Sequence, residues 1–482
     1  MDVRSLPSLL VVLCVAVIAC SCSDGASSEA APTSAVAFVD VNVVPMDRER
    51  IIEAQTVVVL GTRIQAIGPV DETEVPEGAR RIEGSGRYLM PGLADMHAHV
   101  DEDALLLFLA NGVTTVRNMH GGPAYLELRE RIARGELLGP TIYTAGPIID
   151  GPVELWPGNA APPLPPDAYE VIESRRDGER VVREQAAAGY DFIKVYDNIP
   201  AEAYEGVTTA ARELGIPVAG HVPFGVGLAG VTLTNIASIE HLRGYIYELF
   251  ADGAELSLGW DKRSRFLAWN YVDTTRFARV IQATVDAGIW NVPTLTRYQK
   301  NMMPTEEHLR RYTSPQARYV NPAIIERMMT GRSFAANARY GSFVEADFVA
   351  GRKVFETKKA FVKALNDAGA NILLGSDDGF SGFATHEELR NLADAGLTPY
   401  EAIATGTKNA AAFLEAADEF GTVAVGMRAD LVLLEDNPLT NVRHLQNRTG
   451  VMVRGRWFAE IELKQMLDQL AASYTGASPG RP

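Results

Sequence analysis

The alternation of apolar and polar residues indicates short β-strands near both ends of the chain. In the segment 36–90, VAFVDVNVV alternates loosely, and TVVVLGTRIQAIG reads as two strands around a turn at Gly61 and Thr62. The segment 416–462 has the same character, with ADLVLL and VMVRGRWF as strand material and Gly455 in a turn. Two β-rich segments at opposite ends of the chain predict one small β-sandwich domain assembled from both termini.

Between these segments the pattern changes to alternating helix and strand. AEAYEGVTTAARELG has the spacing of an amphipathic helix that ends at Gly215, and IPVAGH follows it as a strand. ETKKAFVKALNDAG repeats this arrangement, ends at Gly369 and precedes ANILLGSD. Eight such strands, most of them separated by helical sequence, predict an α/β fold over residues 91–415, specifically a (β/α)₈ TIM barrel. Residues 463–482 predict a terminal helix and a loose tail.

The beginning of the chain has the pattern of an export signal. The apolar run after Arg4 is too short for a comfortable membrane span and is typical of a signal peptide, here residues 1–19. The sequence VIAC resembles a bacterial lipobox, in which Cys20 becomes the lipidated first residue; a plain secretory signal is the alternative. Residues 20–35 are small and polar and predict a flexible tether. We therefore expect a protein exported to the bacterial cell envelope and attached to a membrane only through this anchor.

Composition narrows the function classes. The 482 residues are 47% hydrophobic, which allows a large core and more than one domain. A formal net charge of -16 argues against a nucleic-acid partner, which would demand a basic surface. All three cysteines (Cys14, Cys20 and Cys22) lie in the leader region, so a structural disulfide or a thiolate metal site is excluded from the folded part. A small-molecule substrate fits this composition, and a homo-oligomer remains open.

Residue types that bind metal ions end several of the predicted strands. His97 and His99 end the first strand, and because residues two apart in a strand point to the same face, both imidazoles are aimed into the barrel mouth. His221, His241 and Asp377 end three later strands. Each of these three could alone be a helix cap or a hydrogen-bonded core residue. Together, four imidazoles and a carboxylate at matching strand ends indicate a site for divalent ions, zinc above all.

Lys194 is a further charged residue in a predicted strand, FIKVYD, whose other members are mostly apolar. An ammonium group buried without a partner is costly enough that it usually gives up its proton. Burial would therefore favour the neutral amine at Lys194. A lysine that snorkels from a misjudged strand is the alternative interpretation.

The chain resembles the amidohydrolase superfamily, specifically its imidazolonepropionase-like and prolidase-like branch. The motifs that carry this resemblance are PGLADMHAH, FIKVYD, VAGHVP, SIEHL, LLGSDDG and GTVAVGMRADLVLLEDNPL, and they cover nearly everything after the tether. The resemblance implies two divalent metal ions bridged by an N6-carboxylated lysine. On the matching positions, the two ions would be held by His97, His99 and Asp377 and by His221 and His241, with Lys194 as the bridge. A mononuclear site with unmodified Lys194 is the alternative.

This resemblance also implies a reaction. A hydroxide bridging the two ions would attack a carbonyl group, and Asp377 would act as the acid and base. We expect hydrolysis of an amide C–N bond in a peptide-like or N-acyl amino acid substrate. Hydrolysis of a cyclic amide, a lactone or a phosphoester is the alternative on the same site, and a solute-binding lipoprotein is the alternative outside enzymes.

Residues near the strand ends are candidates for contacts around the metal site. Related dipeptidases are expected to carry an aromatic hydroxyl after the strand-five histidine, where this chain has Phe224, so dipeptide specificity does not follow from the resemblance. His120 and His386 are expected to support the site from outside the ligand set. The candidates to bind a substrate carboxylate are Tyr196, Arg243, Tyr245, Arg297 and Tyr298, each of which could instead be exposed to solvent without a role.

Overall fold

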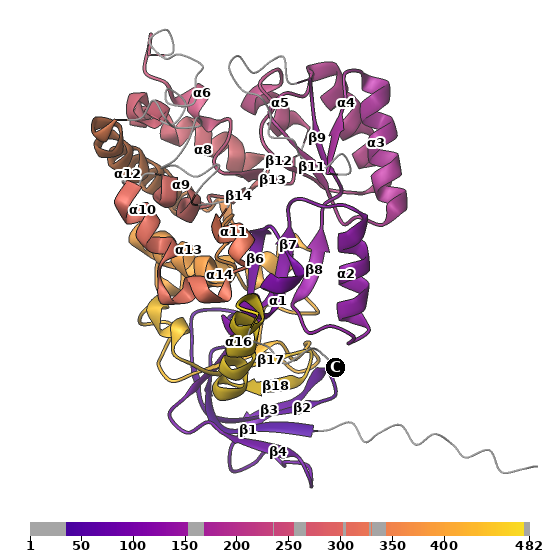
Figure 1. Ribbon diagram of the computed structural model, residues 1–482, viewed down its shortest axis with the longest axis vertical. Helices are drawn as coiled ribbons and strands as arrows, with labels where there is room; N and C mark the ends of the chain where they lie inside the picture. Colours follow the sequence, from indigo (N-terminus) through magenta and orange to yellow (C-terminus); the bar gives the residue numbers. More distant parts are fainter. Residues whose placement is uncertain are drawn as a thin grey trace, which may run out of the picture.

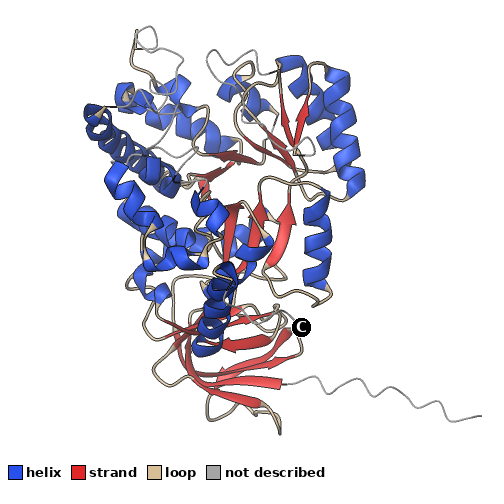
Figure 2. Ribbon diagram, viewed as in Figure 1, coloured by secondary structure: helices blue, strands red, loops and turns tan. Residues whose placement is uncertain are grey.

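The computed structural model describes residues 35–152, 168–234, 236–254, 267–301, 305–326, 329 and 344–476. The fold is mixed α/β, with parallel sheets surrounded by helices and a mainly antiparallel sheet at one end of the molecule (Figures 1 and 2). The predicted signal peptide (1–19), Cys20 and the tether up to residue 34 lie outside the described residues. None of the described helices is long and apolar enough to cross a membrane.

Strands from both ends of the chain form one eight-stranded sheet. Its order is β18-β17-β16-β5-β1-β2-β3, with β4 paired to β1. The C-terminal strand β16 pairs antiparallel with β5, so the two chain ends meet in the middle of the sheet. The strands are β1 (Ala35–Val43), β2 (Ile52–Leu60), β3 (Arg63–Pro69), β4 (Arg80–Glu83), β5 (Tyr88–Pro91), β16 (Leu431–Leu434), β17 (Arg448–Val453) and β18 (Arg456–Ala459).

Apolar residues from both ends also share one core cluster on this sheet. The rings of Phe38 and Trp457 pack edge to face with centroids 5.1 Å apart. The turn after β17 needs a glycine, because Gly455 has φ +77° and a Cβ atom there would lie 1.8 Å from the carbonyl oxygen of Gly61 in the β2–β3 turn. The sequence therefore identified both turns and the sharing of one sheet, while the folding of this sheet into a sandwich stays a prediction.

The parallel strands form two further sheets. The three-stranded sheet has the order β6-β7-β8, and the seven-stranded sheet has the order β10-β9-β11-β12-β13-β14-β15. Their strands are β6 (Leu93–Ala98), β7 (Val113–Asn118), β8 (Thr141–Thr144), β9 (Ile148–Asp150), β10 (Tyr169–Val171), β11 (Ile193–Val195), β12 (Val218–Gly220), β13 (Ser238–Glu240), β14 (Trp290–Val292) and β15 (Asn371–Ile372).

Backbone hydrogen bonds connect these two sheets at both edges. On one side the amide of Met96 in β6 donates to the carbonyl of Leu374, just beyond β15, at 2.7 Å. On the other side Ala145 and Phe192 form a parallel bridge between the segments that follow β8 and precede β11. The large apolar core cluster combines residues of these strands with residues of the helices that cover them.

Helices follow most of the parallel strands and cover them from outside (Figure 1). The predicted helix that stops at Gly215 is present as α4, and both α3 and α4 end at a left-handed glycine, Gly189 with φ +88° and Gly215 with φ +69°. The described helices are α1 (Leu105–Ala110), α2 (Pro123–Ala133), α3 (Arg175–Ala188), α4 (Ala201–Leu214), α5 (Gly227–Leu233), α6 (Tyr245–Leu249), α8 (Phe277–Asp286), α9 (Leu295–Asn301), α10 (Thr305–Tyr312), α11 (Pro322–Glu326), α12 (Glu345–Asp367), α13 (Phe383–Asp394), α14 (Pro399–Thr405), α15 (Lys408–Phe413) and α16 (Glu460–Tyr474).

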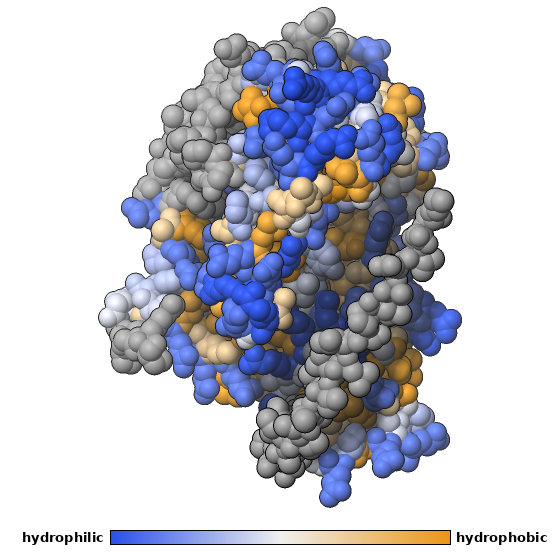
Figure 3. All heavy atoms as spheres, turned by 90° about the vertical axis from the view of Figure 1, so that its right-hand side faces the viewer, coloured by the Kyte–Doolittle hydropathy of each residue, from blue (hydrophilic) through white to orange (hydrophobic). Residues whose placement is uncertain are grey.

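The outer face of α3 and α4 is strongly polar. Arg175 pairs with Glu205 at 2.7 Å and Arg183 pairs with Glu213 at 2.5 Å, so ion pairs link the two helices across their exposed sides. Hydrophilic residues accordingly dominate the upper part of this side of the molecule (Figure 3). Exposed pairs of this kind contribute little stability, and the apolar inner faces of α3 and α4 hold them in place.

Candidate metal centre

The six predicted ligands lie at or just beyond the C-terminal ends of parallel strands. Because the strands run in the same direction, their C-terminal ends meet on one side of the sheets, where ligands of α/β proteins are usually bound. His97 lies in β6, and His99 is the first residue after that strand. Lys194 lies in β11. The other three ligands follow strands: His221 follows β12, His241 follows β13, and Asp377 lies beyond β15.

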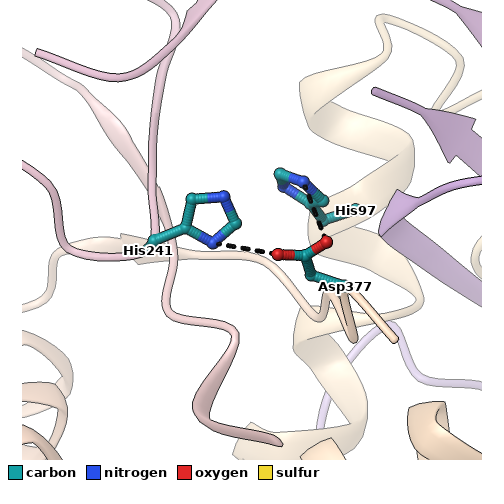
Figure 4. Close-up of side chains that lie close together, drawn as sticks. All are labelled: His97, His241 and Asp377. Atoms are coloured by element: carbon teal, nitrogen blue, oxygen red, sulfur yellow. Dashed lines mark ion pairs between the residues drawn. The ribbon is translucent and has the colours of Figure 1, made fainter. Parts of the chain in front are cut away.

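His97, His241 and Asp377 form a compact group. One ligand atom from each lies within 4.8 Å of the others, and the two imidazole rings have centroids 4.5 Å apart. The Asp377 carboxylate lies between the rings (Figure 4), with Oδ1 3.9 Å from His97 Nε2 and Oδ2 3.6 Å from His241 Nδ1. His99 reaches the same carboxylate, with Nε2 3.0 Å from Oδ1. This group combines residues that the resemblance assigns to different ions.

His221 lies beside His241, and Lys194 lies beside Tyr196, which stacks on His221. The rings of His221 and His241 have centroids 5.2 Å apart, and His221 Nδ1 is 3.0 Å from Asp197 Oδ1. Lys194 is only 1% exposed, and its Nζ lies 5.6 Å from the centroid of the Tyr196 ring. Within the described part of the chain, His221 Nε2 and Lys194 Nζ have no hydrogen-bond partner. The structure thus brings all six predicted ligands to one region.

Burial keeps the imidazoles of His97, His221 and His241 neutral near pH 7. It lowers the pKa of His97 to about 3, that of His221 to about 4, and that of His241 well below its ordinary value. Burial also lowers the pKa of Lys194 to about 8, although the charge of Glu240 opposes this shift. Neutral imidazoles are the form that binds a metal ion.

Asp377, in contrast, is held as a carboxylate. Burial would raise its pKa, but the charge of Arg297 and the neighbouring imidazoles hold the pKa well below its ordinary value. Arg297, on α9, forms an ion pair with Asp377 Oδ2. Asp377 is therefore a firmly ionised carboxylate next to the neutral imidazoles of His97 and His241.

Left-handed backbone occurs at three of the strand ends in the site. His241, Leu242, Thr294 and Asp377 have φ values of 60°, 55°, 47° and 47°. Non-glycine residues rarely adopt this conformation, and where they do, the surrounding structure must hold them there. The chain thus turns sharply just where His241 and Asp377 are presented.

Glu240 and Arg117 were not singled out from the sequence. Glu240 is fully buried, and its Oε2 lies 2.7 Å from His97 Nδ1. Arg117, in β7, donates to Glu240 Oε1 at 2.7 Å and is itself 0% exposed. Both are charged residues inside predicted strands, which is the same signal that pointed to Lys194.

Two further carboxylates and a hydroxyl support the ligands. Asp197 Oδ1 lies next to His221 Nδ1, and Thr294 Oγ1 lies 2.7 Å from His241 Nδ1. Asp95 accepts the amide of Ser376 at 3.0 Å and so anchors the segment that leads to Asp377. In the sequence, nothing around Asp197, Thr294 or Asp95 distinguishes these residues from ordinary polar residues.

Four of the five proposed substrate contacts lie at the site. Tyr196 stacks on His221 with ring centroids 4.2 Å apart, and Tyr298 donates to the carbonyl of His241 at 2.6 Å. Arg297 contacts Asp377, and Arg243 Nη1 lies 3.8 Å from Asp197 Oδ2.

Tyr245 is not brought to this region. It is fully buried, and its hydroxyl bonds to Asn291 at 2.6 Å and Thr284 at 3.0 Å inside the core. Tyr245 is the first residue of α6, and its side chain points in a different direction from that of Arg243 two positions earlier. Its expected contact with substrate therefore has no support in the structure.

The two supporting histidines differ in position. The rings of His120 and His99 have centroids 6.0 Å apart, so His120 adjoins the site. His386 instead lies with Nε2 2.8 Å from the carbonyl of Asn111 and 3.1 Å from Arg448 Nη1. His386 therefore contacts the end of α1 and β17, and its predicted contact with the metal site is not seen. Its neighbour Thr385 instead reaches Asp95, at 2.7 Å.

Residues 88–458 match the sequence pattern of the Amidohydrolase family. The chain belongs to this family. The predicted family is therefore confirmed, and membership supports the predicted class of enzyme, a hydrolase acting on carbon–nitrogen bonds, as well as the binding of divalent metal ions.

Individual proteins and solved structures are also similar to this chain. An imidazolonepropionase from Geobacillus sp. (strain WCH70) is 36% identical over 104 residues, which is 20% of this chain and 24% of the relative, so the match spans about a quarter of that protein. A bottromycin amidohydrolase has a similar structure, with a TM-score of 0.71 and 25% identity over 92% of this chain and 91% of its own. A putative prolidase from Bifidobacterium longum has a similar fold, with a TM-score of 0.65 and 20% identity over 91% of this chain and 100% of its own.

Proposed function

We propose that this protein is a metal-dependent hydrolase that cleaves an amide C–N bond in a peptide-like or N-acyl amino acid substrate. The observation that carries this proposal is the pair of buried nitrogen atoms without a partner in the described chain, Lys194 Nζ and His221 Nε2. A buried polar atom without a partner is costly, so such atoms indicate a missing ligand. Imidazole nitrogens with carboxylate oxygens are a donor set that suits zinc. The residues present therefore fit a metal site.

The proposed ligand set keeps the roles that the family resemblance implies. Carboxylation of Lys194 would add carbon dioxide to Nζ, form one N–C bond and release one proton, and the product would be an anionic bridge. His97, His99 and Asp377 would hold one ion, and His221 and His241 the other. When bound, two such ions would lower the pKa of a shared water and polarise the substrate carbonyl.

Side chains of the protein would orient the reactants and move the proton. The Asp377 carboxylate lies between His97 and His241, and in the proposed reaction it would accept a proton and return it to the leaving amine. Arg297 contacts this carboxylate, Arg243 lies near Asp197, the Tyr298 hydroxyl donates to the His241 carbonyl, and the Tyr196 ring stacks on His221. Such a positively charged, hydrogen-bonding rim suits a substrate that carries a carboxylate next to the amide.

The same proposal includes the architecture that presents these residues. We infer that the two parallel sheets close into one (β/α)₈ barrel, since hydrogen bonds join β6 to the segment after β15 and the segment after β8 to that before β11. We also infer that the eight-stranded sheet folds into the β-sandwich, because its core cluster combines both chain ends. The boundaries at residues 90 and 415 remain predictions.

An assay panel tests the reaction. Metal-reconstituted protein should hydrolyse dipeptides or N-acyl amino acids, and Asp377→Asn should abolish turnover while the fold persists, because an amide cannot take up the proton. Hydantoins, lactones and phosphoesters make up the other arms of the panel. Turnover confined to those arms would replace the amide assignment with its alternative, and binding without any turnover would support a solute-binding protein.

The proposed location is the bacterial cell envelope, through a lipid on Cys20. The support for it is the sequence pattern of residues 1–20. Radiolabelled palmitate should enter the wild-type protein, and Cys20→Ser should abolish labelling without changing the folded part, because the acyl chain needs the thiol. Label that persists in the variant would contradict the lipobox assignment.

A further inference from the structure

Two consecutive aspartates beyond β15 both form ion pairs with α9. Asp377 pairs with Arg297, and Asp378 Oδ2 accepts from Lys300 Nζ at 2.6 Å. Arg297 and Lys300 lie three positions apart on α9, so they project from the same face of the helix. The helix therefore presents two cations, in order, to two carboxylates that are neighbours in the chain.

The backbone at Asp377 departs from an extended strand. In an extended strand, consecutive side chains point to opposite faces. Asp377 instead has φ 47°, a left-handed conformation that non-glycine residues rarely adopt. Because the chain turns there, the carboxylates of Asp377 and Asp378 both reach α9. Such a conformation persists only where surrounding contacts hold it, and the two ion pairs supply contacts of this kind.

Asp378 is almost fully buried and has further partners. Its side chain is 2% exposed, and Oδ1 accepts the amide of Phe380 at 2.8 Å. Arg311 of α10 has Nη2 3.2 Å from the same oxygen, and its Nη1 donates to Glu387 of α13 at 2.6 Å. Arg311 thus remains as a cationic partner of Asp378 when Lys300 is changed, so a Lys300 variant does not leave this carboxylate unpaired.

The pair of Lys300 and Asp378 differs from the exposed ion pairs on the outside of the molecule. The Lys300 side chain is only 12% exposed, and the pair joins two elements that lie 78 positions apart in the sequence. Water and salt screen such a pair less than an exposed pair. Arg297 and Tyr298, which both contact the metal centre, belong to the same short helix. A contact that fixes Lys300 therefore also fixes the position of Arg297.

We propose that Lys300 is a positioning residue that determines specificity: its ion pair with Asp378 sets the position of α9 and so places Arg297 to bind the substrate carboxylate. This inference rests on the proposed function, because the carboxylate belongs to the substrate class proposed there. Lys300 acts through Arg297 and not on the substrate itself. The consequence is a preference for substrates with a carboxylate over neutral amides of the same shape.

A lysine series and a pair of matched substrates test this inference. The panel substrate with the highest turnover is compared with its carboxamide, which has the same size and no negative charge. Lys300→Met removes the ammonium and keeps most of the apolar side chain, and Lys300→Arg keeps the charge. Lys359→Met is the matched control, because Lys359 is 16% exposed but pairs, at 2.8 Å, with Glu356 of its own helix, α12.

The substrate with a carboxylate should respond to Lys300→Met, and the carboxamide should not. KM for the carboxylate should rise about tenfold with kcat within about twofold, because a displaced Arg297 weakens binding while the metal ligands stay in place. Lys300→Arg should restore most of the preference, and Lys359→Met should retain it. Lys300→Met combined with Arg297→Met should be no worse than Arg297→Met alone, because Lys300 acts through Arg297.

Hydrogen exchange of α9 without substrate is a readout that does not depend on turnover. We expect faster exchange of the α9 amides in Lys300→Met, with metal content unchanged. Unchanged exchange, or an equal rise of KM for both substrates, overturns the role of Lys300 while the proposed function stands. If the wild-type protein turns over no amide that carries a carboxylate, the proposed function fails, and the specificity assigned to Lys300 fails with it.

Discussion

At the scale of single residues, each buried histidine of the candidate centre is held at its Nδ1 atom. Glu240 holds His97, Asp197 holds His221, and Thr294 holds His241. A hydrogen bond at Nδ1 fixes the ring, as in many metal centres where such partners raise affinity. In His97 and His221 it leaves Nε2 to face the site, whereas His241 Nδ1 itself also lies 3.6 Å from Asp377 Oδ2. The rings are thus held in fixed orientations, and their low pKa values keep them unprotonated.

Lys194 separates the binuclear proposal from its alternatives. Metal analysis of wild type should return about two equivalents per chain, and Lys194→Ala should lose most metal and nearly all activity, because two cations would face each other without the bridging anion. Lys194→Arg should not recover either, since a guanidinium stays charged and cannot take up carbon dioxide. His386→Ala is the control and should retain its metal. Two bound metals and normal turnover in Lys194→Ala would contradict the bridge.

The depressed pKa values of His97 and His221 also predict how stability depends on pH. In the unfolded chain both imidazoles have the ordinary pKa of 6.5, whereas in the folded protein the pKa is about 3 for His97 and about 4 for His221. Between the folded and the unfolded pKa of each histidine, the unfolded state therefore binds more protons. The free energy of unfolding of metal-free protein should therefore fall as the pH decreases, by roughly 1 kcal/mol per pH unit for each histidine. Urea titrations near neutral and near acidic pH measure this, and His221→Gln should flatten the dependence. An unchanged slope in that variant would assign the effect to other groups.

At the scale of elements, α9 connects the centre to α13. The segment around its start supplies Thr294, Arg297 and Tyr298 to the site. Glu388 of α13 is 0% exposed and accepts the amides of Leu295 at 2.8 Å and Thr296 at 2.6 Å. Burial raises the pKa of Glu388 to about 8, which marks a carboxyl group retained in the core for these bonds.

Glu388→Gln should loosen α9 while leaving the ligand side chains unchanged. Above the pKa of Glu388, about 8, the amide has one acceptor oxygen where the carboxylate has two, so in alkaline buffer one buried N–H loses its partner at a cost of about 1–3 kcal/mol. We expect faster hydrogen exchange at Leu295 and Thr296 and a raised KM, with metal content preserved. Glu356→Gln is the control, because Glu356 is an exposed partner of Lys359. Normal exchange and KM in Glu388→Gln would show that α13 does not position α9.

The site could be predicted from sequence wherever a residue broke a strand pattern. His97, His221 and Lys194 stand out because imidazole or amine groups end or interrupt apolar runs. The helical contacts could not be read in this way, because neighbouring residues on a helix point about 100° apart. Thr385 therefore reaches Asp95 while His386 does not reach the ligands, and Tyr245 joins the core although Arg243 lies at the site.

At the scale of the whole molecule, the mainly antiparallel sheet ties the two ends of the chain to the catalytic part. β16 lies between β5 and β17, and its pairing partner β5 leads directly into β6, which carries His97. The pattern of strands at both ends predicted this sharing. The exact pairing could not be predicted, because strand order depends on contacts between residues that lie more than 300 positions apart in the sequence.

Deletion of residues 420–482 tests whether the molecule needs both ends. The deletion removes β16, β17 and β18, which leaves β5 without its outer partner and uncovers the apolar cluster around Phe38 and Leu89. An unpaired edge and an exposed apolar face both favour association. We expect the truncated chain to aggregate, as measured by size-exclusion chromatography, and to lose metal because β6 follows the uncovered strand. The matched control removes only residues 477–482, beyond α16, and should remain monodisperse if the wild-type protein is. A soluble, active chain after the larger deletion would show that the two ends do not form one cooperative unit.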